Sequence, residues 1–182
     1  MGKKITIDSA TLFNKGLEMI EARWLFDIEM ARIEAIVHPQ SIIHSMVEFI
    51  DGSTLAQLST TDMCFPIQYA VTYPKRHKNQ LKPLNFAELQ KLEFEAPRTQ
   101  DFPAIDLAKK AGTEGGILPS VYNAANEIAV NAFVSGQIKF NQIWETVANV
   151  IDETTQIDKI TLETLIQADR EARIKAHERI TS

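Results

Sequence analysis

Residues 45–60, SMVEFIDGSTLAQLST, decide the fold class of this chain because they contain its strongest β signal. Two arms rich in β-branched and apolar residues flank Asp51-Gly52, a dipeptide that supplies the positive φ angles of a tight hairpin turn. Apolar and polar residues alternate along the first arm, which gives one apolar face and one mixed face. This pattern predicts strands of a sheet that is covered on one side or shared with a partner.

Upstream of the hairpin, the pattern predicts a short strand from Lys4 to Ile7 that runs into a helix from Ala10 to Phe26. Asp8 or Ser9 is a candidate cap for this helix, because a side-chain oxygen there can accept a bond from a first-turn N–H group. Gly16 lies inside the helix, where glycine costs about 1 kcal/mol relative to alanine. Its presence indicates a close approach of another group to the backbone.

Two further stretches around the hairpin are extended in character. IEAIVHP (33–39) is β-branched and ends at a proline. Residues 72–103 contain four of the seven prolines and a basic cluster at 75–78, and they predict an extended connector with a short strand at Lys91–Glu95. A cluster of this kind can bind an anion, but its setting favours a solvated linker.

From Phe102 onward the apolar spacing is helical. FPAIDLAKKAG (102–112) ends at a glycine cap, and SVYNAANEIAVNAFVSG (120–136) begins after Pro119 with Ser120 as its cap. Two more amphipathic stretches follow, so we expect a small antiparallel bundle. The predicted fold class is α+β: a mixed sheet with covering helices, then a linker and a helical bundle, divided at residues 1–72, 73–98 and 99–182.

The composition is that of an ordinary globular protein, with 45% hydrophobic and 24% charged residues among 182. The net charge of −5 argues against a nucleic-acid partner. Cys64 is the only cysteine, which fits a reducing compartment. The sequence contains no membrane-spanning run and no signal-peptide core, so we expect a cytoplasmic protein without a membrane partner.

The stretch DSATLFNKGLE (8–18) is the best candidate for chemistry. A helix N-terminus attracts anions, and Ser9, Asn14 and Lys15 could donate to a phosphate there. Glu18 lies four residues after Asn14, on the same face, and could ligate a cation. The alternative is a capped surface helix with solvated charges; the spacing alone favours it, since one carboxylate does not make a metal site.

Other polar residues give weaker signals. His38 and His44 are six residues apart, which does not match a helical zinc pair, so hydrogen-bonded structural roles are favoured. NAANE (123–127) lies within a predicted helix, where small residues usually permit close helix packing. The sequence contains no glycine-rich dinucleotide motif and no phosphate-binding P-loop.

Three blocks of sequence resemble a known family. MGKKITIDSATLFNKGLEMIEARWLF (1–26), HPQSIIHSMVEFIDGSTLAQL (38–58) and NAANEIAVNAF (123–133) are similar to the C-terminal portion of the 1-deoxy-D-xylulose 5-phosphate reductoisomerase family. The similarity extends over essentially the whole chain. It implies a homodimeric enzyme of the non-mevalonate isoprenoid pathway that uses NADPH and Mg²⁺ or Mn²⁺ to isomerise its substrate and reduce the product by hydride transfer.

The resemblance also implies roles for individual residues. Ser9, Asn14 and Lys15 would bind the substrate, mainly through its phosphate, and Glu18 would act in catalysis as a metal ligand that also touches the substrate. A second group, Gly2, Met1 and Met63, would lie against the NADPH cofactor. His44 matches a histidine near the site, and its role stays open.

The N-terminal half of the family, with its NADPH domain and its other acidic metal ligands, has no counterpart here. We therefore expect an enzyme fragment that has no turnover alone, with partly exposed residues at 1–7 and 63–65. The alternative is a non-catalytic dimerisation or scaffold module. In the family the dimer forms mainly through strands of the catalytic domain, which would account for the uncovered face of the predicted hairpin.

Overall fold

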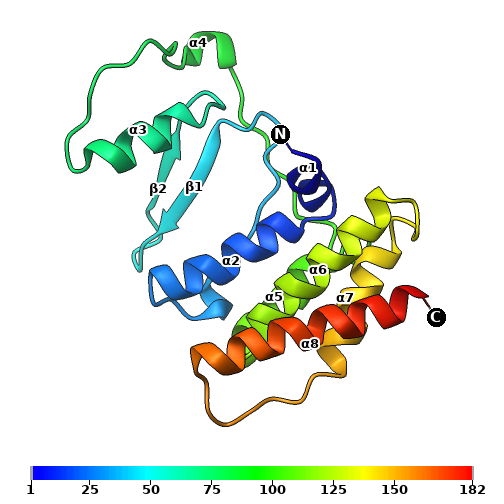
Figure 1. The fold of residues 1–182 in the computed structure, drawn as a ribbon. Helices are drawn as coiled ribbons and strands as arrows, with labels where there is room; N and C mark the ends of the chain where they lie inside the picture. Colours follow the sequence, from blue (N-terminus) through cyan, green and yellow to red (C-terminus); the bar gives the residue numbers. More distant parts are fainter. Residues whose placement is uncertain (1, 182) are drawn as a thin grey trace. The chain divides into compact units, whose positions relative to one another are not determined.

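The computed structural model of the chain describes residues 2–181 and divides into two compact units. Unit 1 combines Met1–Ala35 with Arg98–Ser182, and unit 2 comprises Ile36–Pro97. Figure 1 labels the helices and strands α1 (Lys3–Ala10), α2 (Phe13–Leu25), β1 (Ile43–Glu48), β2 (Thr54–Leu58), α3 (Cys64–Thr72), α4 (Phe86–Leu89), α5 (Ala104–Glu114), α6 (Leu118–Val134), α7 (Gln142–Asp152) and α8 (Leu162–Thr181). A short 3-10 helix, η1 (Met30–Arg32), follows α2.

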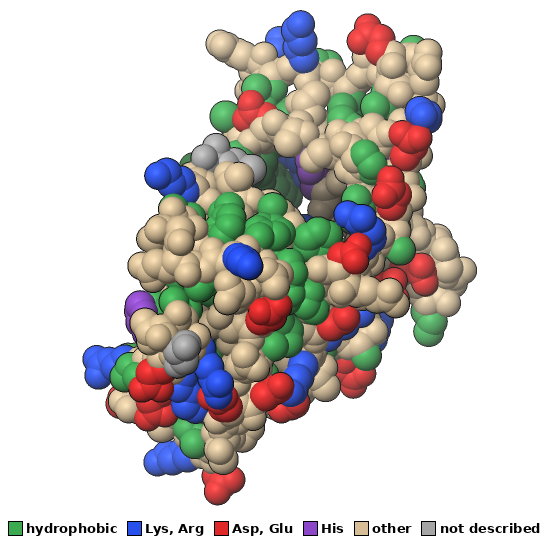
Figure 2. Space-filling view, turned by 90° about the vertical axis from the view of Figure 1, so that its right-hand side faces the viewer, with side chains coloured by type: hydrophobic (Ala, Val, Ile, Leu, Met, Phe, Trp, Pro, Cys, Tyr) green, Lys and Arg blue, Asp and Glu red, His purple; other side chains and the backbone are tan. Residues whose placement is uncertain are grey.

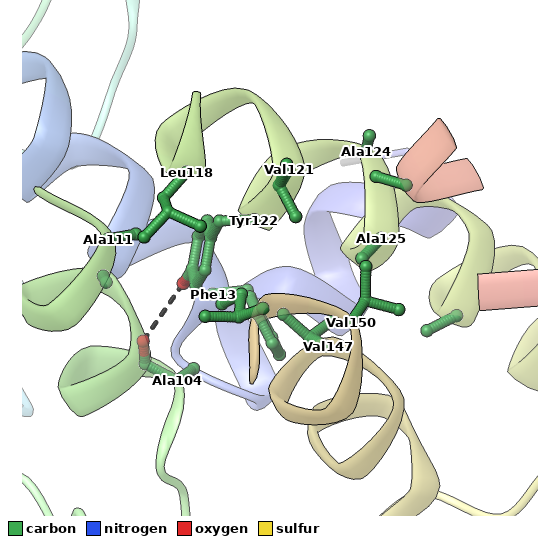
Figure 3. Close-up of a cluster of buried hydrophobic side chains, with 14 of the residues drawn as sticks. Phe13, Ala104, Ala111, Leu118, Val121, Tyr122, Ala124, Ala125, Val147 and Val150 are labelled. Carbon is green, nitrogen blue, oxygen red and sulfur yellow. Dashed lines mark hydrogen bonds between the residues drawn. The ribbon is translucent and has the colours of Figure 1, made fainter. Parts of the chain in front are cut away.

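Unit 1 is built around α6, which packs against α5, α7 and α8. Alanine, valine and isoleucine side chains at helical spacing fill the space between these helices, and small residues let the backbones approach closely. The large buried side chains at the centre are Phe13 and Tyr122, whose rings lie 5.1 Å apart (Figure 3). The predicted C-terminal helical bundle is therefore present.

The two N-terminal helices belong to the same unit as the bundle. α1 packs against α2 and α6, and α2 packs along α5 (Figure 1). The buried residues of α2 are Phe13, Gly16, Met19 and Ile20, which lie at helical spacing on one side. The core of unit 1 thus joins segments about a hundred residues apart in sequence.

Unit 2 contains an antiparallel hairpin of β1 and β2, with Glu48 opposite Thr54. The predicted hairpin is confirmed, but its loop has three residues, because the Phe49 N–H group donates to the Ser53 carbonyl and only Gly52 in the loop has a positive φ, of 82°. Such a loop combines an ordinary turn with one left-handed residue. The side chain of Asp51 accepts bonds from the backbone and the hydroxyl of Ser53.

The other extended stretches of unit 2 meet at one point. Residues 33–39 and 91–95 form a single antiparallel bridge, Val37 to Glu95, instead of two strands. The segment after Thr72 is otherwise extended, apart from the short helix α4. A helix that the sequence analysis did not predict, α3, precedes it.

Two predictions about local structure were wrong. The stretch from Lys4 to Ile7 is helical instead of a strand, because packing against α6 favours a helical arrangement and Lys4 pairs with Asp8 one turn later. Gly112 does not end its helix: α5 continues to Glu114, and Gly115, with a φ of 65°, follows it. Gly112 instead lies against the Met30 side chain.

The α+β class is confirmed. The sheet that residues 2–181 form is a two-stranded antiparallel one and not the mixed sheet that we expected. Strands from outside this chain would be needed to make it mixed. Within the same residues, no helix is both long enough and apolar enough to cross a bilayer.

Candidate functional site

A sharp bend between α1 and α2 carries the polar stretch that the sequence analysis singled out. The hydroxyl of Thr11 donates to the Ile7 carbonyl at 2.8 Å, and the Leu12 N–H group donates to the Ser9 carbonyl at 3.3 Å. Leu12 adopts a left-handed conformation with a φ of 66°, which ends one helix and starts the next. Such a conformation costs roughly 1–2 kcal/mol for a residue other than glycine, so neighbouring contacts must hold the bend.

The predicted cap at this bend is wrong. Asp8 and Ser9 lie in the last turn of α1, and α2 begins at Phe13 without any side-chain cap. The first N–H groups of a helix have no partner within the helix, so the first turn of α2 can receive an anion. Ser9 is exposed and its carbonyl contacts the start of α2, which places it beside this turn.

Two of the predicted site residues converge on the carboxylate of a third. Asn14 Nδ2 donates to Glu18 Oε1 at 2.6 Å, and the Lys15 ammonium contacts Glu18 Oε2. The side chains of Lys15 and Glu18 are 43% and 48% exposed, so solvent screens this ion pair and a ligand can reach it. Two donors and one carboxylate therefore lie on one exposed side of α2, near its positive end.

Glu18 fits the role of a single metal ligand. A hard divalent cation prefers several oxygen ligands, and within residues 2–181 no group of three or more acidic, histidine or cysteine side chains is close enough to hold a metal. The donor set in this chain is therefore one part of a possible metal site. Asn14 and Lys15 would have to exchange partners when Glu18 binds a cation.

The remaining predicted residues lie on other elements of the chain. Gly2 occupies the N-cap position of α1, and Met1 lies outside the described residues. Met63 is 69% exposed at the start of α3, in unit 2. His44 Nε2 lies 3.1 Å from the Ser59 carbonyl, also in unit 2.

His38 is held in a similar way: its Nδ1 lies 2.8 Å from the Glu93 carbonyl and its ring stacks on Phe94. Both histidines thus have the hydrogen-bonded structural contacts that their spacing favoured. The charges on the face shown in Figure 2 are of both signs and interspersed.

The sequence did not predict the buried polar contacts that three residues make near the bend. Asp8 is 2% exposed and Asn126 is 0% exposed, and Asn126 Nδ2 donates to Asp8 Oδ1 at 2.9 Å. The hydroxyl of Tyr122 donates to the Ala104 carbonyl at 3.1 Å (Figure 3). Burial, and to a smaller extent the charge of Asp8, raises the pKa of Tyr122. The polar residues of NAANE were the only hint of this in the sequence.

The comparisons agree with the resemblance in sequence. Residues 58–175 match the family described as "DXP reductoisomerase C-terminal domain", and residues 1–26 match "1-deoxy-D-xylulose 5-phosphate reductoisomerase C-terminal domain". Among curated relatives, the reductoisomerase of Symbiobacterium thermophilum is 52% identical over 178 residues, which is 98% of this chain and 46% of that protein. The Desulforamulus reducens protein is 54% identical over 97% of this chain and 46% of its own length.

Solved structures give the same result. The Zymomonas mobilis reductoisomerase, solved with NADPH, matches with a TM-score of 0.93 and 47% identity over 98% of this chain and 47% of that one. A reductoisomerase solved with NADPH, fosmidomycin and magnesium matches with a TM-score of 0.89 and 40% identity, over 100% of this chain and 47% of its own.

This chain spans about half the length of the curated relatives that it matches. The two family regions cover residues 1–26 and 58–175, and they include the α1–α2 bend and most of the bundle. The chain therefore belongs to the 1-deoxy-D-xylulose 5-phosphate reductoisomerase family.

Proposed function

We propose that the complete protein to which this chain corresponds converts 1-deoxy-D-xylulose 5-phosphate to 2-C-methyl-D-erythritol 4-phosphate in non-mevalonate isoprenoid biosynthesis. Family membership and relatives that are about half identical support this activity. When bound, NADPH would supply the hydride and Mg²⁺ or Mn²⁺ would polarise the substrate oxygens. Solved relatives that contain NADPH and magnesium support these cofactors.

Within this activity, the present chain would hold the substrate by its phosphate. The observation that carries this proposal is the convergence of Asn14 and Lys15 on Glu18 beside the uncapped first turn of α2. Ser9, Asn14 and Lys15 would donate to the phosphate, and the charge of Lys15 would strengthen its bond. Glu18 would turn to the cation and the nearby substrate oxygens.

The remaining assignments concern the cofactor. Gly2, Met1 and Met63 would contact NADPH in the complete protein.

Glu18 is one carboxylate of a larger ligand set, so the chain by itself would lack a complete metal site and would show no turnover. Consumption of NADPH by the isolated chain, with substrate and Mn²⁺, would contradict this expectation.

Phosphate binding gives the direct test of the substrate site. Inorganic phosphate is titrated into the ¹⁵N-labelled chain, and we expect the amide resonances of Ser9, Asn14 and Lys15 to shift. Lys15→Gln should weaken binding, whereas Lys109→Gln, which removes an exposed lysine charge on α5, should leave it unchanged. Unmoved resonances in the parent chain would refute the phosphate site.

A chimera tests the activity of the complete protein. Fusing this chain behind the N-terminal half of the Symbiobacterium thermophilum relative would supply the missing ligands and cofactor domain. We expect the chimera to consume NADPH in the presence of substrate and Mg²⁺, and the Glu18→Gln variant to lose most of this rate. Equal rates for both proteins would argue against Glu18 as a ligand.

The second proposal is a homodimer formed through the hairpin. Several large apolar side chains of unit 2 are exposed, among them Val47 (58%), Ile50 (108%) and Leu55 (66%). Exposed apolar residues on strands with free backbone edges are typical of an interface. Sedimentation should show a dimer that Leu55→Arg disrupts and that Lys109→Gln leaves intact; a parent monomer would exclude both the dimer and the scaffold alternative.

A further inference from the structure

Helix α6 carries two buried polar side chains that contact the two sides of the α1–α2 bend. Asn126 contacts Asp8 on α1, and Tyr122 lies against Gly16 on α2. The two residues are four apart, so they lie one above the other on the same side of α6. One turn of α6 therefore contacts both α1 and α2, the two helices that carry the proposed phosphate donors.

The contact with α1 is a buried pair. Asp8 Oδ1 accepts a bond from Asn126 Nδ2 at 2.9 Å, and Asp8 Oδ2 lies 2.5 Å from the Lys4 ammonium. A buried carboxylate gains little net stability from its partners, since desolvation offsets most of the attraction. Directional bonds nevertheless define its position closely. This pair is therefore better suited to orienting α1 than to stabilising it.

The contact with α2 is a close packing contact. A Cβ atom at Gly16 would lie 2.3 Å from the Tyr122 hydroxyl and 3.2 Å from the Ala104 carbonyl. Only glycine fits between α2 and these groups, so the helix backbone itself approaches the bundle. The close approach expected at Gly16 is confirmed, and the approaching groups are Tyr122 of α6 and two alanines of α5.

The proposed donors lie directly beside these two contacts, on a bend that the buried side chains of Thr11 and Phe13 also hold. Ser9 directly follows Asp8, and Lys15 directly precedes Gly16. Leu12, between them, is in a strained left-handed conformation that is retained only where the surroundings determine it. Movement of α1 or α2 would change the position of Ser9 relative to Asn14 and Lys15.

We propose that Asp8 and Asn126 are positioning residues for the phosphate site, so that the C-terminal bundle sets the geometry at which Ser9 meets the donors of α2. The inference rests on the proposed function, because it concerns the same site. Neither side chain would touch the substrate: both are buried, and each acts through Ser9. A misplacement of about 1 Å at a site of this kind can cost roughly a hundredfold in rate.

The test compares phosphate affinity with folding in four variants of the full chain. Asp8→Ala removes the buried carboxylate while keeping a good helix former. Asn126→Asp sets two carboxylates against each other, and the double exchange Asp8→Asn with Asn126→Asp restores a carboxylate–amide pair in the opposite order. Asn131→Asp, an exposed change on the same helix, is the matched control. The affinity for inorganic phosphate is measured from the shifts of the amide resonances. The stability of each variant is measured in parallel by urea unfolding.

We expect Asp8→Ala and Asn126→Asp to weaken phosphate binding about tenfold or more while bundle resonances stay dispersed. The double exchange should recover most of the affinity, and Asn131→Asp should leave it unchanged. A purely structural role would lower the unfolding midpoint without altering the affinity of the folded chain. Recovery by exchange is therefore the decisive observation.

Three outcomes overturn the proposal. Parent-like affinity in folded Asp8→Ala excludes a positioning role, and this variant decides the question if Asn126→Asp does not fold. A folded double exchange that stays as weak as Asp8→Ala also excludes it. If phosphate moves no site resonance in the parent chain, the proposed phosphate site itself fails. The first two outcomes, in contrast, leave the phosphate site intact and exclude only the positioning role of Asp8 and Asn126.

Discussion

Replacing Gly16 with alanine tests how closely α2 approaches the bundle. On an exposed helix this change would stabilise the protein by about 1 kcal/mol. Here the new Cβ atom would lie 2.3 Å from the Tyr122 hydroxyl and 2.9 Å from the Ala108 Cβ atom, so something must move. The Tyr122 ring cannot move freely because it is fully buried and packs on Phe13.

The expected magnitude follows from two costs and one gain. Overpacking a core costs typically about 1–3 kcal/mol. Displacing the Tyr122 hydroxyl from the Ala104 carbonyl leaves a buried polar group without a partner, which costs about 1–3 kcal/mol more. After the gain in helix propensity, we expect Gly16→Ala to lower the free energy of unfolding by about 3 kcal/mol, within a range of roughly 1–5.

The assay is urea unfolding followed by circular dichroism, with Gly112→Ala as the matched control. A Cβ atom at Gly112 would meet the flexible end of Met30, which can shift at little cost. Combining Gly16→Ala with Tyr122→Phe removes the atom at 2.3 Å and should cost less than the two single changes added together. If Gly16→Ala is as stable as the parent, the close packing of α2 against α5 and α6 is refuted.

Three further predictions concern other parts of the fold. The carboxylate of Asp62 accepts a bond from the Cys64 thiol and raises the pKa of that thiol. Asp62→Asn should lower this pKa and so increase the thiolate fraction at mildly alkaline pH. Alkylation of Cys64, measured by mass spectrometry, should then be faster than in the parent. The two bonds that Asp51 accepts from Ser53 lower the pKa of its carboxyl group below the ordinary value of 3.8. The resulting stabilisation of the hairpin is present above pH 3.8 and is lost as the pH falls through the lowered pKa of the folded chain. The amide resonances of the hairpin should therefore shift in acid, and Asp51→Asn should abolish this shift. The Arg173 side chain pairs with Glu127 of α6 and with Asp169 of its own helix while about one-third exposed, so Arg173→Ala should cost about 1 kcal/mol in urea unfolding. A much larger loss would contradict the view that these are weak surface ion pairs.

Local patterns predicted the elements whose signals are local. The Asp51-Gly52 turn lies between strands that pair with each other, so nearby residues contain all the information that the hairpin needs. The ends of α6 lie within about two residues of the prediction, because proline and glycine act on the backbone where they stand. The predicted cap is wrong: Pro119 lies in the first turn and Ser120 lies inside the helix. The α+β class followed from these two features.

The failures arose where distant residues decide the local structure. The alternation from Lys4 to Ile7 resembles a strand, but this segment is helical and packs against α2 and α6. Asp8 looked like a cap because acidic residues favour helix starts, but its partner Asn126 is 118 residues away. A single sequence contains no signal for that pairing, so the anchoring of the site could not be predicted.

The division of the chain by packing differs from its division by composition. The proline-rich stretch looks like a boundary in the sequence, yet α1 and α2 pack with the helices that follow it, in one unit. The proposed phosphate donors are therefore part of a folding unit whose core comes mainly from the C-terminal helices. Because a ligand that binds only the folded form stabilises it, phosphate at this bend would stabilise the whole bundle and not the bend alone. Substrate binding at the bend and the stability of the C-terminal helices would then depend on each other, although the structure places no side chain of these helices at the exposed donors.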